Sequence, residues 1–409
     1  MISVSPAFAF CDVKNAKIQY KDNKIMEKLI ADFTKFYGVA PTVAARAPGR
    51  LEILGNHTDY NQGFVLSCAV EQDTRFALLP VEGKHCQIKD FRDSSVCEFD
   101  LDNIDKPIPG DWGNYVKGVI VELRKRGIEV GAFKAGMVSS IPLSAGMSSS
   151  AAFETAVGFA LREAFNIELS NAEWARVGQG VENHYMGLKT GLLDQFSSIF
   201  GKKDSMILTD FRSVEVLRTV PLPAGYSIVV VNSMVKHNLV ESEYNTRRSD
   251  CESAAEKLMQ IYPDVKTLRD VSLEQLSAAK SALTVQEYRR ALHVVGECTR
   301  VIEAVRMLEH NDVKSFGRLW FDSHESSRVN FENSTQELDY LVELAKSIPG
   351  GLGARLSGGG FGGITIHLVP SDGAPEYVNR IKTAFKARTG IEAECIICSI
   401  GDGATSSKL

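Results

Sequence analysis

Several features that would point to other classes of protein are missing from this 409-residue sequence. Basic residues are not in excess: 46 Lys and Arg stand against 51 Asp and Glu, and the formal net charge is −5. Nucleic-acid binding is therefore not expected, because phosphate backbones are bound by basic surfaces. No apolar run approaches the roughly 20 residues that cross a bilayer, so we expect no membrane association. The first residues combine no basic segment with an apolar stretch, which predicts that there is no secretory signal.

Cysteine is also sparse for a disulfide-stabilised protein, with eight residues scattered along the chain. This distribution predicts free thiols and a reducing, cytoplasmic environment. Cys395 and Cys398 have CxxC spacing, which is compatible with half of a redox or metal site. No second CxxC or His pair completes a zinc site, however, and the apolar neighbours favour a buried strand.

The length suffices for two or three ordinary domains, and 44% hydrophobic with 24% charged residues is typical of a globular protein with a sizeable core. A turn cluster at residues 221–225 (PLPAG) predicts a boundary between a lobe of residues 1–220 and a lobe of residues 221–409. Helices are predicted at residues 25–37, 151–165, 289–308 and 336–347, and strands at 138–143, 227–232, 364–369 and 393–400. Because strands and helices do not alternate strictly, the pattern favours an α+β fold.

The first motif with chemical content is a serine-rich turn between a predicted strand and a predicted helix. It reads Ser139-Ser140-Ile141-Pro142-Leu143-Ser144-Ala145-Gly146-Met147-Ser148-Ser149-Ser150-Ala151-Ala152. Small residues let backbone N–H groups approach a phosphate, the helix N-terminus favours an anion, and hydroxyls bind phosphate or Mg²⁺. The chain has no GxxxxGK[ST], so this is not a Walker P-loop. The alternative is a serine-rich N-cap on a core helix.

A second motif is rich in glycine and precedes a predicted strand. It reads Arg355-Leu356-Ser357-Gly358-Gly359-Gly360-Phe361-Gly362-Gly363. Five glycines in six residues are unfavourable in conformational entropy, but they suit a backbone that passes close to a ligand or another loop. A flexible surface loop is the alternative.

The third motif concentrates polar side chains between glycines. It reads Ala47-Pro48-Gly49-Arg50-Leu51-Glu52-Ile53-Leu54-Gly55-Asn56-His57-Thr58-Asp59-Tyr60. A carboxylate accepts hydrogen bonds from sugar hydroxyls, and a guanidinium stabilises charge on a transferring phosphoryl group. The motif therefore predicts recognition of a hydroxylated ligand, with a solvated loop as the alternative.

In this order, the three motifs resemble those of the GHMP kinases, and further segments resemble the galactokinases within that family. These segments are residues 63–66 (GFVL), 191–195 (GLLDQ), 237–239 (HNL), 242–248 (SEYNTRR), 316–319 (FGRL) and 323–327 (SHESS). The resemblance extends from about Phe33 to Ile400. It implies a two-lobed fold, with an N-terminal lobe like ribosomal protein S5, a ferredoxin-like C-terminal lobe and the active site between them.

The resemblance also implies an ATP-dependent sugar 1-kinase that uses Mg²⁺, with D-galactose as the first candidate substrate. It assigns catalysis to Arg50 and Asp194, the latter as the base for the anomeric hydroxyl. It assigns sugar binding to Asn56, His57, Asp59, Gly191 and Tyr244, and Mg²⁺ binding to Ser150 and Glu182. It assigns ATP binding to Ser144, Ala145, Gly146, Met147, Ser148, Ser149 and Ser150. It assigns a structural role to a glycine loop of Gly358, Gly359, Gly360, Gly362 and Gly363.

Each of these residues also has a structural interpretation. Asp194 is compatible with a carboxylate that interacts with a helix N-terminus, and Glu182 with an exposed helical glutamate. His57 is compatible with a structural hydrogen-bonding residue, and Tyr244 with a core tyrosine.

Asn56 departs from the galactokinase pattern, which has a glutamate at this position to accept a hydrogen bond from the C6 hydroxyl of the sugar. Ser144 stands where the phosphate loop usually has glycine. The departure at Asn56 leaves open a related substrate such as a uronic acid or an amino sugar. A non-catalytic sugar sensor on the same scaffold is a third hypothesis, against which the intact serine run at residues 148–150 argues. Monomer and homodimer remain open.

Overall fold

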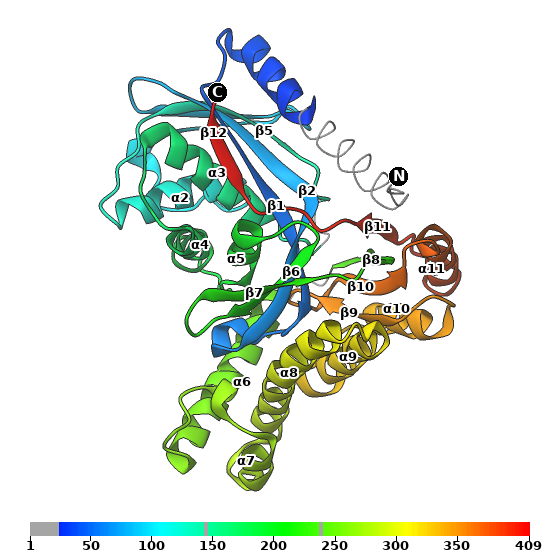
Figure 1. Cartoon of the computed structure of the whole chain (residues 1–409). Helices are drawn as coiled ribbons and strands as arrows, with labels where there is room; N and C mark the ends of the chain where they lie inside the picture. Colours follow the sequence, from blue (N-terminus) through cyan, green and yellow to red (C-terminus); the bar gives the residue numbers. More distant parts are fainter. Residues whose placement is uncertain (1–23, 143–145, 237–239) are drawn as a thin grey trace, which may run out of the picture.

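The computed structural model describes residues 24–142, 146–236 and 240–409. Two residues of the predicted ATP site, Ser144 and Ala145, lie outside these ranges, as does the segment 237–239. Strands and helices are mixed, and two sheets form the centres of two lobes (Figure 1). The predicted α+β fold is confirmed.

The first sheet has eight strands, six of which lie in the order β12-β1-β2-β5-β3-β4, while β6 pairs with β2 and β7 with β6. The strands are β1 (Val43–Leu54), β2 (Phe64–Pro80), β3 (His85–Asp90), β4 (Val96–Asp100), β5 (Phe133–Ser139), β6 (Ser205–Asp210), β7 (Glu215–Pro221) and β12 (Thr405–Lys408). All pairs are antiparallel except β3 with β5.

Helices cover both faces of this sheet. One face packs on α2 (Asn114–Arg124), α3 (Ser149–Phe165), α4 (Asn171–Gly180) and α5 (Leu193–Phe200), and apolar residues of strands and helices form one buried core there. The opposite face is covered by the helix of residues 24–37, whose Leu29 and Phe33 are buried against Ala77. The described part of this helix, residues 24–37, contains the predicted one, and its apolar spacing is that of a single buried face.

The second sheet has four antiparallel strands in the order β11-β8-β10-β9. They are β8 (Tyr226–Lys236), β9 (Gly353–Ser357), β10 (Gly362–Pro370) and β11 (Glu394–Cys398). With the helices between β8 and β9 and the helix after β10, the chain follows the β-α-β-β-α-β path of ferredoxin-like folds. Alternation along β8 places Val229 and Val231 in the core with α10 and α11, and Ile228 and Val230 in the core with β1, α8 and α9.

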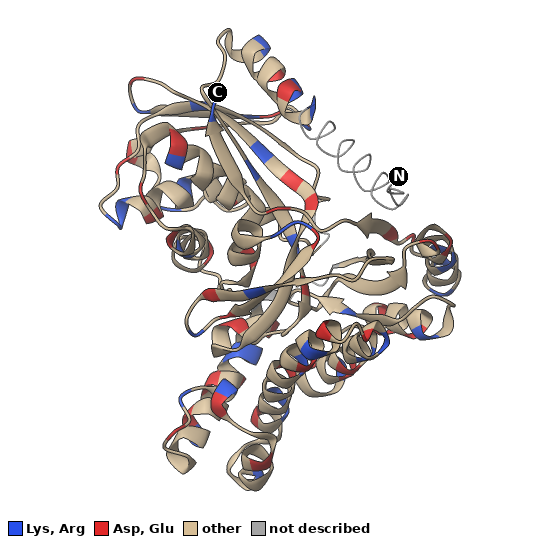
Figure 2. Cartoon of the chain, in the orientation of Figure 1, with Lys and Arg blue, Asp and Glu red and all other residues tan. Residues whose placement is uncertain are grey.

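The remaining helices belong to the second half of the chain. They are α6 (Val240–Ile261), α7 (Leu273–Ala278), α8 (Val285–Glu309), α9 (Val313–Ser326), α10 (Gln336–Ser347) and α11 (Ala374–Thr389). Short 3-10 helices are η1 (Asp59–Asn61), η2 (Leu101–Asn103), η4 (Leu268–Asp270) and η5 (Lys280–Ala282), and two π-helical turns are η3 (Val181–Tyr185) and η6 (Ser327–Phe331). Acidic and basic residues are interspersed along α8 and α9 (Figure 2). No helix in the described ranges is long and apolar enough to cross a membrane.

Most predicted elements are confirmed, but two strand ends are wrong, because β5 and β11 end before the predicted residues 143 and 400. Strand β5 ends at Ser139, although the sequence predicted strand up to residue 143, because Pro142 cannot donate to a ladder. Cys395 and Cys398 lie in β11 as free thiols, in agreement with the strand interpretation. The division at residue 220 stays a prediction. It falls at the last residue of β7, and β7 and β8 lie in different sheets, whereas β12 from the predicted second lobe pairs with β1 of the first.

Candidate active site

A cavity of about 190 Å³ lies where the end of β1, the start of α5, the start of α6 and the glycine-rich segment meet. Its lining contains most of the residues that the sequence assigned to sugar binding and catalysis. The lining residues are Arg50, Glu52, Asn56, His57, Asp59, Thr190, Gly191, Leu193, Asp194, Tyr244, Gly358 and Gly359. Residues from both predicted lobes therefore form its wall.

Asp194 lies in the first turn of α5, where its carboxylate is held from two sides. Arg50 Nε donates to Asp194 Oδ1 at 2.7 Å, and the Ser148 hydroxyl donates to Oδ2. Arg50 Nη1 also donates to the carbonyl of Gly146 at 2.8 Å, and the Arg50 backbone N–H donates to the carbonyl of Met147. These bonds connect Arg50 and Asp194 to the serine-rich turn. The carboxylate side chain nevertheless remains 31% exposed, so a ligand in the cavity can reach it.

Arg50 remains charged in spite of its position. Burial lowers the pKa of this guanidinium, but the neighbouring carboxylate of Asp194, together with Glu52 and Glu182, raises it above its ordinary value. The side chain is 5% exposed and is therefore a fixed cation at the edge of the cavity.

The described part of the serine-rich turn leads into α3. Ser148 occupies the N-cap position with a left-handed backbone (φ 53°), and its side chain makes no capping hydrogen bond. The hydroxyl is directed to Asp194 instead, so the N-terminal N–H groups of α3 receive no cap from it. The alternative of an ordinary serine N-cap is therefore wrong for Ser148, and the helix N-terminus has the features of an anion site.

Ser150 and Glu182 are brought together across two helices, with Ser150 Oγ 3.3 Å from Glu182 Oε1. Glu182 lies in the π-helical turn η3 that follows α4 and also accepts a hydrogen bond from Thr190 Oγ1 at 2.6 Å. Burial and the nearby charge of Asp194 raise the pKa of Glu182. It is 5% exposed, so the interpretation as an exposed helical glutamate is wrong.

The donors at this point fit Mg²⁺, which prefers oxygen ligands and binds through one or two carboxylates and phosphate oxygens. A cation beside Glu182 would also offset the burial of its charge. The described residues contain no group of three or more His, Cys, Asp or Glu that would form a site of protein ligands alone.

Asp59 and Gly191 fit against each other with no space between them. An alanine Cβ at Gly191 would lie 1.6 Å from Asp59 Oδ2, so only glycine leaves that carboxylate in place. The backbone N–H of Leu193 donates to the same oxygen at 3.3 Å. Gly191 therefore acts through its small size, and Asp59 is positioned at the cavity wall.

Asn56 and His57 are held mainly by protein groups. Asn56 is 1% exposed, and its amide nitrogen donates to Glu52 Oε1 at 3.0 Å and to the carbonyl of Gly358 at 2.8 Å. His57 Nδ1 lies 2.9 Å from the hydroxyl of Tyr60, and Nε2 lies 3.2 Å from the carbonyl of Gly359. Burial lowers the pKa of His57 to about 3, so the imidazole is neutral.

The glycine-rich segment runs directly over the cavity. A Cβ at Gly360 (φ 82°) would lie 2.2 Å from the carbonyl oxygen of Asn333, whereas one at Gly359 would lie 3.6 Å from the ring of Tyr244. The close approach to another segment confirms the interpretation of this motif as a packed loop rather than a free linker.

Sequence reasoning missed four residues around the cavity. Glu52 and Thr190 line it, Arg355 is fully buried and donates from Nη2 to Glu52 Oε1 at 2.9 Å, and Asn333 Nδ2 donates to Asn56 Oδ1 at 3.0 Å. Glu52 lies in the third sequence motif and Arg355 in the second, so these motifs could have indicated both residues. Nothing in the sequence singled out Asn333.

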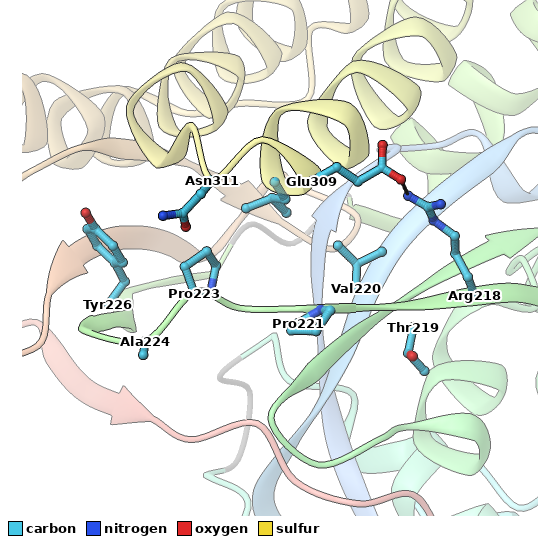
Figure 3. A pocket seen from close by; sticks show the side chains of 10 residues that line it. Arg218, Thr219, Val220, Pro221, Pro223, Ala224, Tyr226, Glu309 and Asn311 are labelled. Atoms are coloured by element: carbon cyan, nitrogen blue, oxygen red, sulfur yellow. Dashed lines mark hydrogen bonds and ion pairs between the residues drawn. The ribbon is translucent and has the colours of Figure 1, made fainter. Parts of the chain in front are cut away.

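A second, more open hollow of about 770 Å³ lies between the β7–β8 connection and the end of α8 (Figure 3). Its charged groups include Arg218 and Glu309, which form an ion pair with each other. The residues assigned to sugar binding and catalysis line the first cavity, and Ser148 and Glu182 are hydrogen-bonded to its lining residues Asp194 and Thr190, so we take it as the candidate active site.

The chain matches three family models: the galactokinase galactose-binding signature at residues 31–80, the N-terminal domain of GHMP kinases at residues 114–202 and their C-terminal region at residues 302–387. A galactokinase of Actinobacillus pleuropneumoniae serotype 5b is 40% identical over 380 residues, which are 91% of this chain and 96% of that protein. This chain belongs to the galactokinase family. A galactokinase of Glaesserella parasuis is 39% identical, with the same two coverages.

Solved structures agree with this membership. Lactococcus lactis galactokinase, in complex with galactose, superposes with a TM-score of 0.88 at 33% identity, and the match covers 94% of this chain and 100% of that one. A D-glycero-D-manno-heptose 1-phosphate kinase has a TM-score of 0.60 at 16% identity, with coverages of 90% and 99%. That second likeness reflects the shared GHMP kinase fold.

Proposed function

We propose that this chain transfers the γ-phosphoryl group of ATP to the anomeric hydroxyl of D-galactose in the cytoplasm. The observation that carries the proposal is the Asp194 carboxylate, which is held by Arg50 and Ser148 and faces a cavity lined by carboxylates, amides and hydroxyls. The galactokinase signature spans residues 31–80 and so includes one wall of this cavity. Family membership and site chemistry thus support the same reaction.

In this mechanism Asp194 accepts the proton of the anomeric hydroxyl as that oxygen attacks the γ-phosphorus and ADP leaves. A positioned general base contributes about 10²–10⁴-fold to the rate. Arg50 keeps the carboxylate oriented and places a permanent positive charge beside the attacked phosphoryl group, where negative charge is spread over the equatorial oxygens.

ATP would be bound at the N-terminus of α3. The uncapped N–H groups there favour its phosphates, and Ser148 links the same turn to Asp194. Ser150 and Glu182 would hold Mg²⁺, which when bound neutralises charge on the phosphates. Glu182 is connected to the cavity through the hydroxyl of Thr190, which lines it, and Ser150 through its hydrogen bond to Glu182.

Asp59 and Tyr244 would bind the sugar from opposite elements, η1 and α6. Asp59 supplies two acceptor oxygens for sugar hydroxyls, and its backbone-anchored position suits bidentate recognition. Tyr244 lies against His57, with ring centroids 5.1 Å apart, and closes the cavity below the glycine-rich segment.

The direct test is an ATP-dependent phosphorylation assay of the purified full-length chain against D-galactose, D-galacturonic acid, D-galactosamine and D-glucose. We expect ADP release and a sugar 1-phosphate with D-galactose as the preferred substrate. A higher kcat/KM for D-galacturonic acid or D-galactosamine would identify that sugar, instead of D-galactose, as the substrate. Galactose binding without ADP release would instead indicate a sensor.

A further inference from the structure

Glu52 is a buried carboxylate at the cavity wall to which the sequence assigned no role. It lies near the end of β1, two residues after Arg50, and both side chains line the same cavity. Residues i and i+2 of a strand point to one face and lie about 7 Å apart, a separation comparable with the width of a pyranose ring. Glu52 therefore faces the end of the cavity away from the Arg50–Asp194 pair.

The carboxylate of Glu52 has acceptor capacity left. Oε1 accepts from Arg355 Nη2 at 2.9 Å and from Asn56 Nδ2 at 3.0 Å. Within the described ranges, the hydrogen bond to Oε2 comes from the same Asn56 nitrogen at 3.3 Å. Because two carboxylate oxygens offer about four acceptor sites, Oε2 can accept from a ligand hydroxyl without losing a protein partner.

Asn56, by contrast, has no free hydrogen-bonding group. Its nitrogen donates to Glu52 and to the carbonyl of Gly358, which uses both N–H bonds. Its oxygen accepts from Asn333 Nδ2 at 3.0 Å, with Ser327 Oγ at 3.5 Å. A flipped amide would place its oxygen against the carboxylate of Glu52 and the carbonyl of Gly358, so this orientation is fixed by electrostatics.

We propose that Glu52 supplies the carboxylate that accepts a hydrogen bond from the C6 hydroxyl of galactose, and that Asn56 is a positioning residue for it. The proposal rests on the proposed function. Galactokinases have a carboxylate at the position of Asn56. In this chain the carboxylate lies four residues earlier, at Glu52, and it accepts a hydrogen bond from the amide of Asn56. Burial raises the pKa of Glu52, and the charges of Arg355 and Arg50 oppose this rise. A second consequence is that an ionised Glu52 repels a C6 carboxylate and disfavours uronic acids.

The test compares D-galactose with 6-deoxy-D-galactose on the wild type and on Glu52→Gln. Hydrogen bonds to charged groups correspond to about 10- to 100-fold in kcat/KM. We expect kcat/KM of the Glu52→Gln variant to fall by about that factor for D-galactose and to change little for 6-deoxy-D-galactose. The ratio of kcat/KM between the two sugars should therefore fall toward one. A structural role alone would lower both values equally and leave the ratio unchanged.

Glu297→Gln is the matched control. Glu297 is also a fully buried carboxylate near Asn56, whose backbone N–H donates to its Oε2 at 3.0 Å, but it does not line the cavity. We expect its ratio between the two sugars to equal that of the wild type, whatever its stability.

A second variant, Glu52→Asn with Asn56→Glu, returns the carboxylate to position 56 and keeps one charge in the cluster. We expect this exchange variant to have the wild-type preference for D-galactose. If Glu52→Gln does not fold, the exchange variant tests whether a carboxylate is needed at this end of the cavity. An unchanged sugar ratio in Glu52→Gln, or a folded exchange variant without the preference, overturns the role of Glu52. Absence of galactose phosphorylation in the wild type overturns the proposed function itself, before any variant is measured.

Discussion

Gly191→Ala should remove most of the activity with little effect on folding, because the added methyl group displaces Asp59. The new Cβ would lie 1.6 Å from Asp59 Oδ2, whereas real Cβ atoms essentially never approach another atom within 3.0 Å. The carboxylate must therefore move by about 1.4 Å, or the turn before α5 must move with Asp194. The backbone of Gly191 lies outside the left-handed region, so alanine brings no conformational strain there.

A misplacement of about 1 Å at a reacting site costs roughly 10²-fold in rate. We therefore expect kcat/KM for D-galactose to fall by about 10²-fold, with a melting temperature close to that of the wild type. The assay is steady-state ADP release with varied galactose, with thermal denaturation of the same samples. Gly373→Ala is the control, because its Cβ would meet only the Pro370 carbonyl at 3.9 Å, far from the site, and should leave both quantities unchanged.

A double variant shows whether the loss acts through Asp59. If it does, Gly191→Ala combined with Asp59→Ala should be no worse than Asp59→Ala alone, since the displaced group is already absent. Additive losses, or a near-normal kcat/KM in Gly191→Ala, would refute the reasoning.

Three further predictions concern the proposed base, a proposed Mg²⁺ ligand and a buried carboxyl group. Asp194→Asn should lower kcat by about 10²–10⁴-fold while calorimetry still detects galactose binding, and a near-normal kcat would remove this base from the mechanism. Ser150→Ala should raise the Mg²⁺ concentration needed for half-maximal activity without changing galactose affinity, and an unchanged Mg²⁺ titration would contradict the metal assignment. Glu154 is buried, and burial raises its pKa well above the ordinary value, so it destabilises the native state increasingly as pH rises above about 4.5. Glu154→Gln should therefore raise the melting temperature by a few degrees at about pH 8 and by much less at about pH 5, and an equal gain at both would contradict this.

Short-range patterns allowed much of the fold, and the residues that line the candidate site, to be predicted. Apolar spacing predicted the helix of residues 24–37, and the serine-rich turn predicted the start of α3 within two residues. The family resemblance assigned Arg50 and Asp194 to one site, and the structure places their side chains 2.7 Å apart. These features depend on local periodicity or on motifs that are contiguous in the sequence.

Features that depend on distant packing were missed. Glu52 is a charged residue in a largely apolar strand, and its burial is compensated by Arg355, 303 residues later. Asn56 was expected to face the C6 hydroxyl, but its amide is occupied by Gly358 and Asn333 from the other lobe. No spacing rule connects positions so far apart, so the hydrogen-bonding state of Asn56 could not be predicted from the sequence.

The pairing of β12 with β1 has a consequence for the order in which this protein matures on the ribosome. Val43 to Arg46 pair with Lys408 to Thr405, and the Arg46 guanidinium binds the carbonyls of Asp402 and Gly403. Until residues 402–408 have been synthesised, β1 has an unpaired edge whose residues are mostly buried in the folded protein, and such edges favour intermolecular pairing. A nascent chain stalled before residue 405 therefore exposes an aggregation-prone strand edge, and the synthesis of β12 is the event that covers it.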